Sequence, residues 1–339
     1  MTRHSRNMQA RFLDYGDPMG LKELREAIAA YLRTARSVHC EAEQILIVSG
    51  SQQGLEISAR VLLDPGDRVW MEEPGYSFAR SVFTYCGCRI VPVPVDAEGL
   101  NVIAGVKKCR NARAVLVTPS HQYPLGTTMT ASRRLQLLDW AEGNRSWILE
   151  DDYDSEYRYE GMPVASLQGL DRNSRVVYIG TFSKVLFPAL RMGYVVIPPD
   201  LVGRFLAVRF AMDIGPAAFP QMVLADFIRE GHFSRHIRRM RAVYAERRSA
   251  LIESIHEELG PAAEIHGAEA GMHLSIILKG ISDRDIAARA ARQCISMIPL
   301  SSLYLGKPTR QGFILGFGST PVKEIPNAVR KLRIILDSK

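Results

Sequence analysis

Lys184 is the residue of this sequence with the clearest capacity for covalent chemistry. It follows the apolar residues 176–179, and Arg191 lies a few positions further on. A lysine that is desolvated behind a buried strand loses basicity and becomes a usable amine nucleophile. Thr181 and Ser183 add hydroxyl groups, and Arg191 adds a guanidinium that can hold a phosphate through two hydrogen bonds. A lysine seen alone would more often be a surface residue, so its neighbours carry this interpretation.

A second segment has the pattern of a phosphate-binding helix start. The apolar residues 45–48 run into Ser49, Gly50, Ser51 and Gln52, where a helix is predicted to begin. Small residues at the start of a helix leave backbone N–H groups free to bind an anion. An ordinary helix cap with a glycine turn would have the same pattern. Ser51 and Gln52 are therefore candidate phosphate ligands only in combination with the other segments.

A third segment places carboxylates behind a buried strand. Residues 147–149 are apolar, and Glu150, Asp151, Asp152 and Tyr153 follow them. Such carboxylates can be exposed loop residues, metal ligands or partners of a buried heterocyclic nitrogen. A calcium-binding EF-hand loop is excluded, because the sixth position counted from Asp152 is a tyrosine and not the required glycine.

The three segments together predict a pyridoxal 5'-phosphate site and no metal site. This cofactor needs a lysine for a Schiff base, a carboxylate beside its pyridine nitrogen and donors for its phosphate. An ionised carboxylate keeps that nitrogen protonated, so that the ring can accept electrons from the substrate. The phosphate-binding P-loop, the dinucleotide motif Gly-x-Gly-x-x-Gly and the zinc motif His-Glu-x-x-His do not occur in the sequence.

The elements that must position these segments have the order of an α/β fold with a mostly parallel sheet. Short apolar runs alternate with helical stretches up to about residue 205, which is typical of such sheets. Ligands of these folds bind beyond the carboxyl ends of the strands, where the three segments lie. The predicted strands are residues 45–48, 68–71, 89–95, 114–117, 147–149, 176–179 and 194–197, and the predicted helices between them are residues 21–33, 51–63, 77–85 and 130–143.

The C-terminal part predicts a second, smaller α+β domain. A long helical stretch covers residues 217–258 with a break near Gly231, and short strand-like and helical pieces follow it. We therefore predict a large cofactor-binding α/β domain over residues 1–205. A connecting helix and a small α+β domain would make up residues 206–339.

Composition favours a globular cytoplasmic protein with reduced thiols. The 339 residues are 47% hydrophobic, yet no apolar run reaches the roughly 18–20 residues of a membrane span. The first twenty residues lack the apolar core of a secretion signal. The five cysteines are scattered and odd in number, which argues against a disulfide framework.

The net charge of +7 is concentrated in the long helical stretch, where seven arginines lie between positions 229 and 248. An anion- or nucleic-acid-binding patch is one interpretation. Helical spacing places Phe233, Ile237, Met240 and Tyr244 on one apolar stripe, which favours the alternative, a solvated helix face.

On these residues the chain resembles the fold-type I aminotransferases, and within them the aminotransferase-like domain of MocR-type regulators of the GntR family. The resemblance covers nearly the whole chain and implies a sheet of seven-stranded type with a small C-terminal domain. The matching segments are Tyr15-Gly-Asp-Pro-Met-Gly20, Ser49-Gly-Ser-Gln-Gln53, Glu73-Pro-Gly-Tyr76, Thr118-Pro-Ser-His-Gln-Tyr-Pro-Leu-Gly126, Glu150-Asp-Asp-Tyr-Asp-Ser-Glu156, Gly180-Thr-Phe-Ser-Lys-Val-Leu-Phe-Pro-Ala-Leu-Arg191 and Gly231-His-Phe-Ser-Arg-His-Ile-Arg-Arg-Met-Arg241.

The resemblance implies a role for each matching residue. Lys184 would form the Schiff base, Asp151 would pair with the pyridine nitrogen and Tyr153 with the ring phenolate; these three would be the catalytic residues. Tyr76 would stack on the ring face, and the hydroxyl, amide and guanidinium groups would hold the phosphate. The full set of implied cofactor contacts is Tyr15, Ser51, Gln52, Tyr76, Tyr123, Asp151, Tyr153, Thr181, Ser183, Lys184 and Arg191.

Two departures from the family concern the ligand. Tyr123 precedes Pro124 where ordinary aminotransferases carry an asparagine. Ile314 stands about where they carry the arginine that binds the substrate carboxylate, with Arg310 close by in the sequence. The particular amino acid or amine therefore stays unassigned.

The resemblance also implies partners. Fold-type I domains form homodimers with shared sites, and Tyr15 would reach the phosphate of the partner subunit. DNA would be bound only through a winged helix-turn-helix module, which does not fit in the residues before Tyr15. A separated effector domain, a truncated gene product and a stand-alone enzyme are all consistent with that.

We therefore expect a pyridoxal-phosphate-binding aminotransferase-like protein that exchanges Schiff bases with an amino acid or amine and completes at least a transaminase half-reaction. The alternative is a non-catalytic ligand-sensing domain of a DNA-binding regulator.

Overall fold

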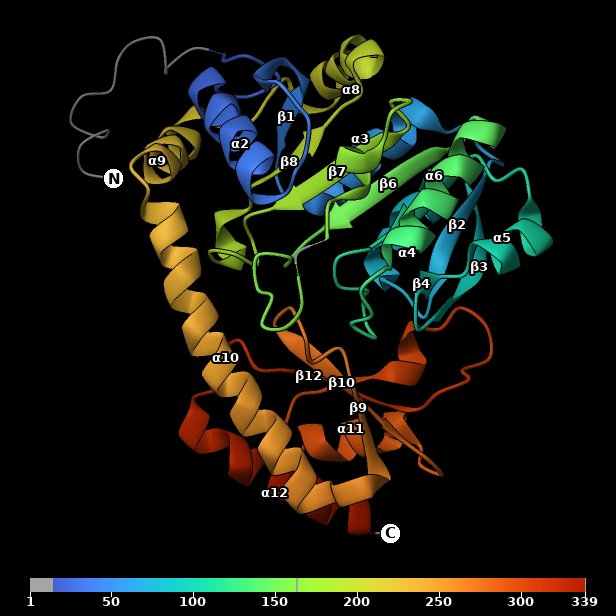
Figure 1. Cartoon of the computed structure of the whole chain (residues 1–339), viewed down its shortest axis with the longest axis vertical. Helices are drawn as coiled ribbons and strands as arrows, with labels where there is room; N and C mark the ends of the chain where they lie inside the picture. The colour runs from blue at the N-terminus through green and yellow to red at the C-terminus, as the bar shows by residue number, and fades with distance from the viewer. Residues whose placement is uncertain (1–14, 163, 339) are drawn as a thin grey trace.

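A computed structural model describes residues 15–162 and 164–338, which form a large and a small sheet beside a long helix (Figure 1). The large sheet has the strand order β1-β8-β7-β6-β5-β2-β3-β4 and the small one the order β11-β12-β10-β9. The strands are β1 Ile45–Val48, β2 Arg68–Glu73, β3 Arg89–Asp96, β4 Gly99–Leu100, β5 Ala114–Val117, β6 Trp147–Asp152, β7 Val176–Thr181, β8 Gly193–Val196, β9 Ala263–His266, β10 His273–Leu278, β11 Ile298–Pro299 and β12 Gly312–Gly316.

The predicted α/β fold with a mostly parallel sheet is confirmed. Strands β7, β6, β5, β2 and β3 pair in parallel, while β8 runs antiparallel to both of its neighbours, β1 and β7. The seven predicted strands are present, and the two-residue β4 adds an eighth by pairing antiparallel with β3.

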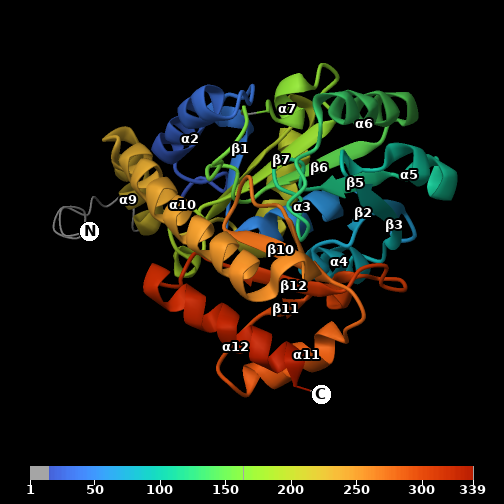
Figure 2. The ribbon, with the colours of Figure 1, turned by 60° about the horizontal axis from the view of Figure 1, so that its bottom comes forward.

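Helices cover both faces of the large sheet because its strands are apolar on both sides. Val69 packs with α3 and α4, and the next residue, Trp70, packs with α5 and α6 on the opposite face. Figure 2 shows α2, α7 and α6 along one side of this sheet. The helices are α2 Lys22–Ala35, α3 Ser51–Leu62, α4 Ser77–Tyr85, α5 Val102–Cys109, α6 Ala131–Asn144, α7 Leu167–Leu170, α8 Val202–Asp213, α9 Ala218–Arg229, α10 His232–Leu259, α11 Asp283–Ala291 and α12 Ile325–Asp337.

The break in the long C-terminal helix lies where it was predicted. Gly231 separates α9 from α10 and has a φ of 75°, a left-handed conformation that glycine adopts without strain. Phe233, Ile237 and Tyr244 form the buried stripe of α10. The division of the chain after residue 205 stays a prediction. Among the described helices, none combines the length and apolar character needed to cross a membrane.

Two strands of the large sheet are longer than predicted. β6 runs on to Asp152 and β7 to Thr181, because Asp151 pairs with Ile179 and Asp152 with Gly180 in the ladder. The apolar run in the sequence ends earlier than the main-chain pairing. The carboxylates of this segment therefore belong to the strand itself and do not form a loop behind it.

Candidate functional site

Strand register brings the three candidate segments to one edge of the large sheet. Gly193 of β8 pairs with Val48 of β1 on one side and with Thr181 of β7 on the other, while Gly180 pairs with Asp152 of β6. The carboxyl ends of β1, β7 and β6 therefore lie within a few strand spacings of one another. The predicted location of the site at this edge agrees with that geometry.

Lys184 lies in the turn after β7, and its side chain is exposed in the single chain. The expectation that it would be desolvated is wrong for this structure, because the turn carries the side chain out beyond the buried strand. Its positive charge still acts on the site: it opposes the burial-driven rise in the pKa of Asp151 and adds to the burial-driven fall in the pKa of His273.

Asp151 is a buried carboxylate whose Oδ1 has no hydrogen-bond partner among the described residues. Burial raises its pKa to about 7, and the negative charges of Asp152, Glu72 and Asp154 contribute to that rise. A buried charge without a partner is costly, and a donor that carries positive charge would relieve that cost. Asp151 is thus suited to a cationic N–H group.

The other carboxylates of β6 have partners on the opposite face of the strand. Asp152 Oδ2 lies 2.9 Å from Arg36 Nε and also accepts a hydrogen bond from the Tyr178 hydroxyl. Glu150 accepts hydrogen bonds from the backbone N–H groups of Leu167 and residue 168. Because successive residues of a strand face opposite sides, these contacts leave only Asp151 facing the other side.

We predict that Arg36 stabilises the fold and is not a ligand of the site. Replacing Arg36 with methionine should lower the free energy of unfolding by about 3–5 kcal/mol, because it leaves Asp152 buried without its cation. Denaturant unfolding measures this. Arg33, in the last turn of α2, is a matched control, since its ion pair with Glu41 is exposed and should contribute less than about 1 kcal/mol. An equal effect of Arg33→Met would contradict this account.

The loop after β1 and Arg191 form a group of hydrogen-bond donors. Gly50 precedes α3 with a φ of 110°, and no side chain caps the N-terminus of that helix. The Arg191 guanidinium donates to the carbonyl of Ser49 at 2.8 Å, and a Cβ added to Gly50 would lie 3.1 Å from Arg191 Nη2. The free N–H groups of the helix start and the guanidinium therefore lie together, as binding of an anion requires.

Polar side chains of the same group also lack partners. Gln52 Oε1 and Ser183 Oγ are buried, and neither finds a hydrogen bond within the described part of the chain. Thr181 Oγ1 accepts the backbone N–H of Ser183 at 3.2 Å, and Ser51 is half-buried at the first position of α3. Unsatisfied buried polar atoms are costly, which indicates that this group of side chains is suited to a polar ligand.

Three tyrosines, Tyr76, Tyr123 and Tyr153, lie close together at the same site. The Tyr123 ring centroid lies 5.8 Å from that of Tyr76 and 6.4 Å from that of Tyr153, both nearly edge to face. Burial raises the pKa of Tyr76 to about 12; the charge of Asp151 adds to the rise and the charge of Arg191 opposes it. The charges of both the Asp151 carboxylate and the Arg191 guanidinium therefore act on the Tyr76 hydroxyl.

The Tyr153 hydroxyl already has a partner that the sequence did not predict. It donates to the backbone carbonyl of His121 at 2.9 Å and lies 3.2 Å from Nδ1 of the same residue. Burial raises its pKa well above the usual range, and the charge of Asp154 adds to the rise. The hydroxyl therefore stays protonated and can donate one hydrogen bond.

Sequence reasoning missed a cluster formed by His121, Asp154 and His273, whose possible metal-ligating atoms all lie within 4.8 Å of one another. Those atoms already have partners: His121 Nδ1 faces Asp154, and His273 Nε2 lies 3.3 Å from the carbonyl of Pro124. The grouping is accounted for by hydrogen bonds. His121 belongs to a segment that the family resemblance included, but its partners come from distant parts of the chain.

Ile314 lies in the middle of β12, whereas Arg310 precedes that strand. Ile314 pairs with Ser275, whose hydroxyl donates to the carbonyl of Pro124 at 2.6 Å, so both residues face the turn that carries Tyr123. Arg310 precedes β12 at the end where Gly312 pairs with residue 277, and lines a separate hollow. The apolar side chain is therefore the one that faces the predicted site.

Tyr15 lies at the start of the described chain and is 82% exposed. Its predicted role toward a partner subunit stays a prediction.

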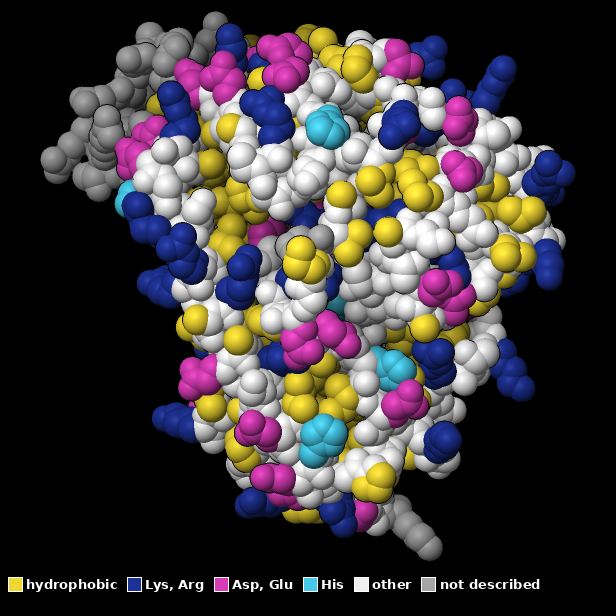
Figure 3. Space-filling view, viewed as in Figure 1, with side chains coloured by type: hydrophobic (Ala, Val, Ile, Leu, Met, Phe, Trp, Pro, Cys, Tyr) yellow, Lys and Arg dark blue, Asp and Glu magenta, His cyan; other side chains and the backbone are white. Residues whose placement is uncertain are grey.

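The arginines of α10 divide into two groups. Arg241, Arg247 and Arg248 donate to backbone carbonyls of other segments, so they tie the helix to its surroundings. Arg238 and Arg239 are exposed, and Figure 3 shows basic side chains along the side of the molecule where α10 runs. Part of this charge therefore holds the helix in place, and the exposed arginines agree with the solvated-face interpretation.

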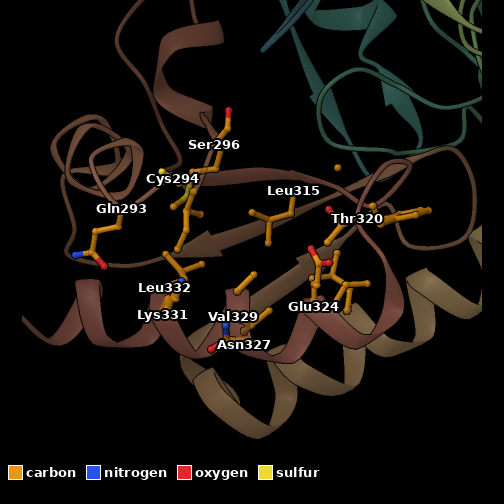
Figure 4. Close-up of a pocket in the computed structure, with 17 residues that line it drawn as sticks. Gln293, Cys294, Ser296, Leu315, Thr320, Glu324, Asn327, Val329, Lys331 and Leu332 are labelled. Atoms are coloured by element: carbon orange, nitrogen blue, oxygen red, sulfur yellow. The ribbon is translucent and has the colours of Figure 1, made fainter.

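A pocket of about 500 Å³ lies away from the sheet edge, between α12 and the segment before β11 (Figure 4). Cys294, Leu315 and Leu332 are among its lining residues. None of the residues predicted for the cofactor lines it, so its position does not bear on the chemistry at Lys184.

Comparisons with known proteins agree with the fold and show the family. A family model described as aminotransferase class I and II matches residues 2–314. A probable rhizopine catabolism regulatory protein, MocR, from Rhizobium meliloti is 40% identical over 98% of this chain and 67% of its own length. The uncharacterized HTH-type regulator YdeL of Bacillus subtilis is 39% identical over 94% of this chain and 68% of its own.

A solved structure has the same fold as this chain. A crystal structure of Pyrococcus horikoshii kynurenine aminotransferase in complex with PMP has a TM-score of 0.91 and 28% identity, and covers 99% of this chain and 85% of its own. The present chain thus spans about two thirds of the length of the regulators and most of the enzyme.

Proposed function

The chain belongs to the class I and II aminotransferase family, and we therefore propose that it binds pyridoxal 5'-phosphate through Lys184. The single observation that carries this proposal is the buried, unpaired Oδ1 of Asp151 on the edge that also holds Lys184 and Arg191. The presence of PMP in the structure of the kynurenine aminotransferase supports it.

The residues of this edge fit the cofactor group by group. Asp151 would pair with the ring nitrogen, and Tyr153 would donate to the ring oxygen. Ser51, Gln52, Thr181, Ser183 and Arg191 would hold the phosphate, and Tyr76 and Tyr123 would flank the ring. When bound, the cofactor supplies an aldehyde for a primary amine and a ring that accepts electrons.

The chain itself would supply positioning and proton transfer. Asp151 would hold a positive charge at the ring nitrogen, because a buried ionised carboxylate without a hydrogen bond favours a cationic partner. The exposed Nζ of Lys184 would accept and return a proton, since it is not engaged in an ion pair in the structure described.

We further propose that the ligand is an amino acid or amine and that the chain completes at least a slow half-reaction. Lys184, Asp151, Tyr153, Thr181 and Arg191 together favour this chemistry. A second candidate is a ligand-sensing domain without turnover. The regulator relatives, of which this chain corresponds to two thirds, favour that alternative, as does the apolar Ile314.

A panel of amino acids and amines separates the two candidates. The cofactor-loaded chain is mixed with each compound, and its absorption spectrum is followed with and without 2-oxoglutarate. We expect a fast spectral response to a suitable ligand, a slow half-reaction and weak multiple turnover, because a poorly oriented substrate binds readily but transfers its proton slowly. Efficient turnover with a common amino acid would overturn the sensor. No half-reaction across the panel would overturn the enzyme.

We also propose that two chains associate beside the site. Large apolar side chains are exposed there: Phe78 is 65% exposed next to Tyr76, and Phe187 is 53% exposed shortly after Lys184. Phe210 of α8 is 59% exposed. Exposed apolar residues gathered around a site favour an interface, and a symmetric dimer is the commonest arrangement.

We expect sedimentation velocity to give twice the mass of one chain. Phe210→Asp should shift the chain toward the monomer and weaken cofactor binding with it, because a buried charge at an interface is costly. Leu135→Asp is the matched control, since Leu135 is 52% exposed on α6. A stable monomer with full cofactor affinity would contradict the dimer.

A further inference from the structure

His121 is a fully buried histidine that the proposed chemistry does not use. Its side chain is 1% exposed, and that of Asp154 is 2% exposed. Nδ1 of His121 lies 3.1 and 3.2 Å from the two carboxylate oxygens of Asp154, and Nε2 lies 3.3 Å from the carbonyl of Gly267. Both ring nitrogens therefore face oxygen acceptors, which fixes the plane of the ring.

On one side, His121 contacts Tyr153, the residue proposed to bind the cofactor ring. The Tyr153 hydroxyl lies 3.2 Å from Nδ1 and donates its proton to the backbone carbonyl of His121. A phenol has a single proton to donate. Any oxygen acceptor presented to Tyr153 must therefore compete with the carbonyl of His121.

On the other side the ring meets the turn between β9 and β10, residues 267–272. Asp154 Oδ2 accepts the backbone N–H of Met272 at 3.3 Å. A Cβ on Gly271 would lie 2.1 Å from His121 Cε1, and a Cβ on Gly126 would lie 2.3 Å from the Cα of Gly267. At Gly271 the turn therefore packs against His121 with no space for a side chain.

We propose that His121 and Asp154 are positioning residues that couple the Tyr153 hydroxyl to the β9–β10 turn. The inference rests on the proposed function, because it places Tyr153 at the cofactor ring. When Tyr153 donates to a bound acceptor, the carbonyl of His121 loses its donor. The imidazole of His121 is held by Asp154 and by the carbonyl of Gly267. A shift of the His121 backbone therefore also moves the ring and, through it, the β9–β10 turn.

Hydrogen exchange measured by mass spectrometry, together with absorption spectra, tests the coupling. The chain is compared with and without pyridoxal 5'-phosphate, and exchange is followed in peptides that contain residues 267–272. In the unmodified chain we expect the cofactor to change the exchange of this turn. His121→Gln and Asp154→Asn should each remove that response and shift the absorption maximum of the bound cofactor.

Matched variants separate coupling from loss of stability. His39→Gln makes the same substitution at an exposed histidine and should leave both readouts unchanged. Tyr153→Phe should remove the response as His121→Gln does, and the double variant should add little, because residues of one network are not additive. Asp154→Asn keeps the side-chain shape and serves if His121→Gln does not fold.

The outcomes distinguish this inference from the function on which it rests. If the unmodified chain binds no cofactor, both are overturned. If it binds the cofactor but the turn does not respond, or if the variants respond as the unmodified chain does, the coupling is overturned and the proposed function stands.

Discussion

Replacing Lys184 with alanine is expected to abolish covalent attachment of pyridoxal 5'-phosphate and to reduce amino-group transfer about 10²–10⁴-fold. The reason is that the variant loses the only primary amine that the sheet edge presents beside Asp151 in the described residues, and with it the proton acceptor. Absorption spectra after incubation with the cofactor, and mass spectra after borohydride reduction, measure the attachment.

Two further variants sharpen this test. Lys184→Arg keeps the positive charge but not the nucleophilic amine, so it should fail in the same way as the alanine variant. Lys107→Ala removes an exposed lysine on α5, away from the edge, and should behave as the unmodified chain. Retention of covalent attachment in Lys184→Arg would contradict the assignment.

Replacing Asp151 with asparagine is expected to weaken cofactor binding at least about tenfold and to slow transfer about a hundredfold or more. A neutral amide cannot hold a positive charge at the ring nitrogen, and loss of one member of a buried charge pair is costly. Equilibrium titration gives the affinity, and single-turnover spectra give the rate. Damage from Asp152→Asn with a silent Asp151→Asn would show instead that the neighbouring carboxylate is the partner.

The same variant should stabilise the cofactor-free chain at alkaline pH. Burial raises the pKa of Asp151 to about 7 in the folded state, so between about pH 4 and pH 7 the folded chain binds a proton that the unfolded chain has lost. Stability therefore falls as the pH rises through this window and stays low above it. Asp151→Asn removes this cost, which is on the order of 4 kcal/mol at about 1.4 kcal/mol for each pKa unit.

Unfolding curves at pH 5 and pH 8 measure the effect. The difference between Asp151→Asn and the unmodified chain should be larger at pH 8. Improved stability with poorer cofactor binding would mark Asp151 as a residue kept for function. Destabilisation by the variant at pH 8 would contradict this account.

The fold, and the position of Lys184 and Asp151 at one edge of the large sheet, could be predicted because they follow from local sequence patterns. The apolar runs 45–48 and 176–179 are buried strands, and register alone brings the residues that follow them together. The end of β6 was predicted too early, because polar residues continue the ladder without changing the apolar pattern. The exposure of Lys184 depends on the path of one turn, which the sequence pattern does not specify.

The environment of Tyr153 could not be predicted from the sequence. Its partner His121 is held by Asp154, which follows β6, and by Gly267, which reaches His121 only because the small sheet packs against the large one. Such contacts have no period or motif in the sequence. The same holds for Asp152, whose role follows from a buried contact with Arg36 at the end of α2.

Reductive labelling of the unmodified chain tests the central claim most directly. The protein is incubated with pyridoxal 5'-phosphate, reduced with borohydride, digested, and its peptides are mapped by mass spectrometry. We predict a single labelled peptide with the phosphopyridoxyl group on Lys184, together with visible absorption before reduction. A label on another lysine, or no visible absorption at any cofactor concentration, would contradict the account.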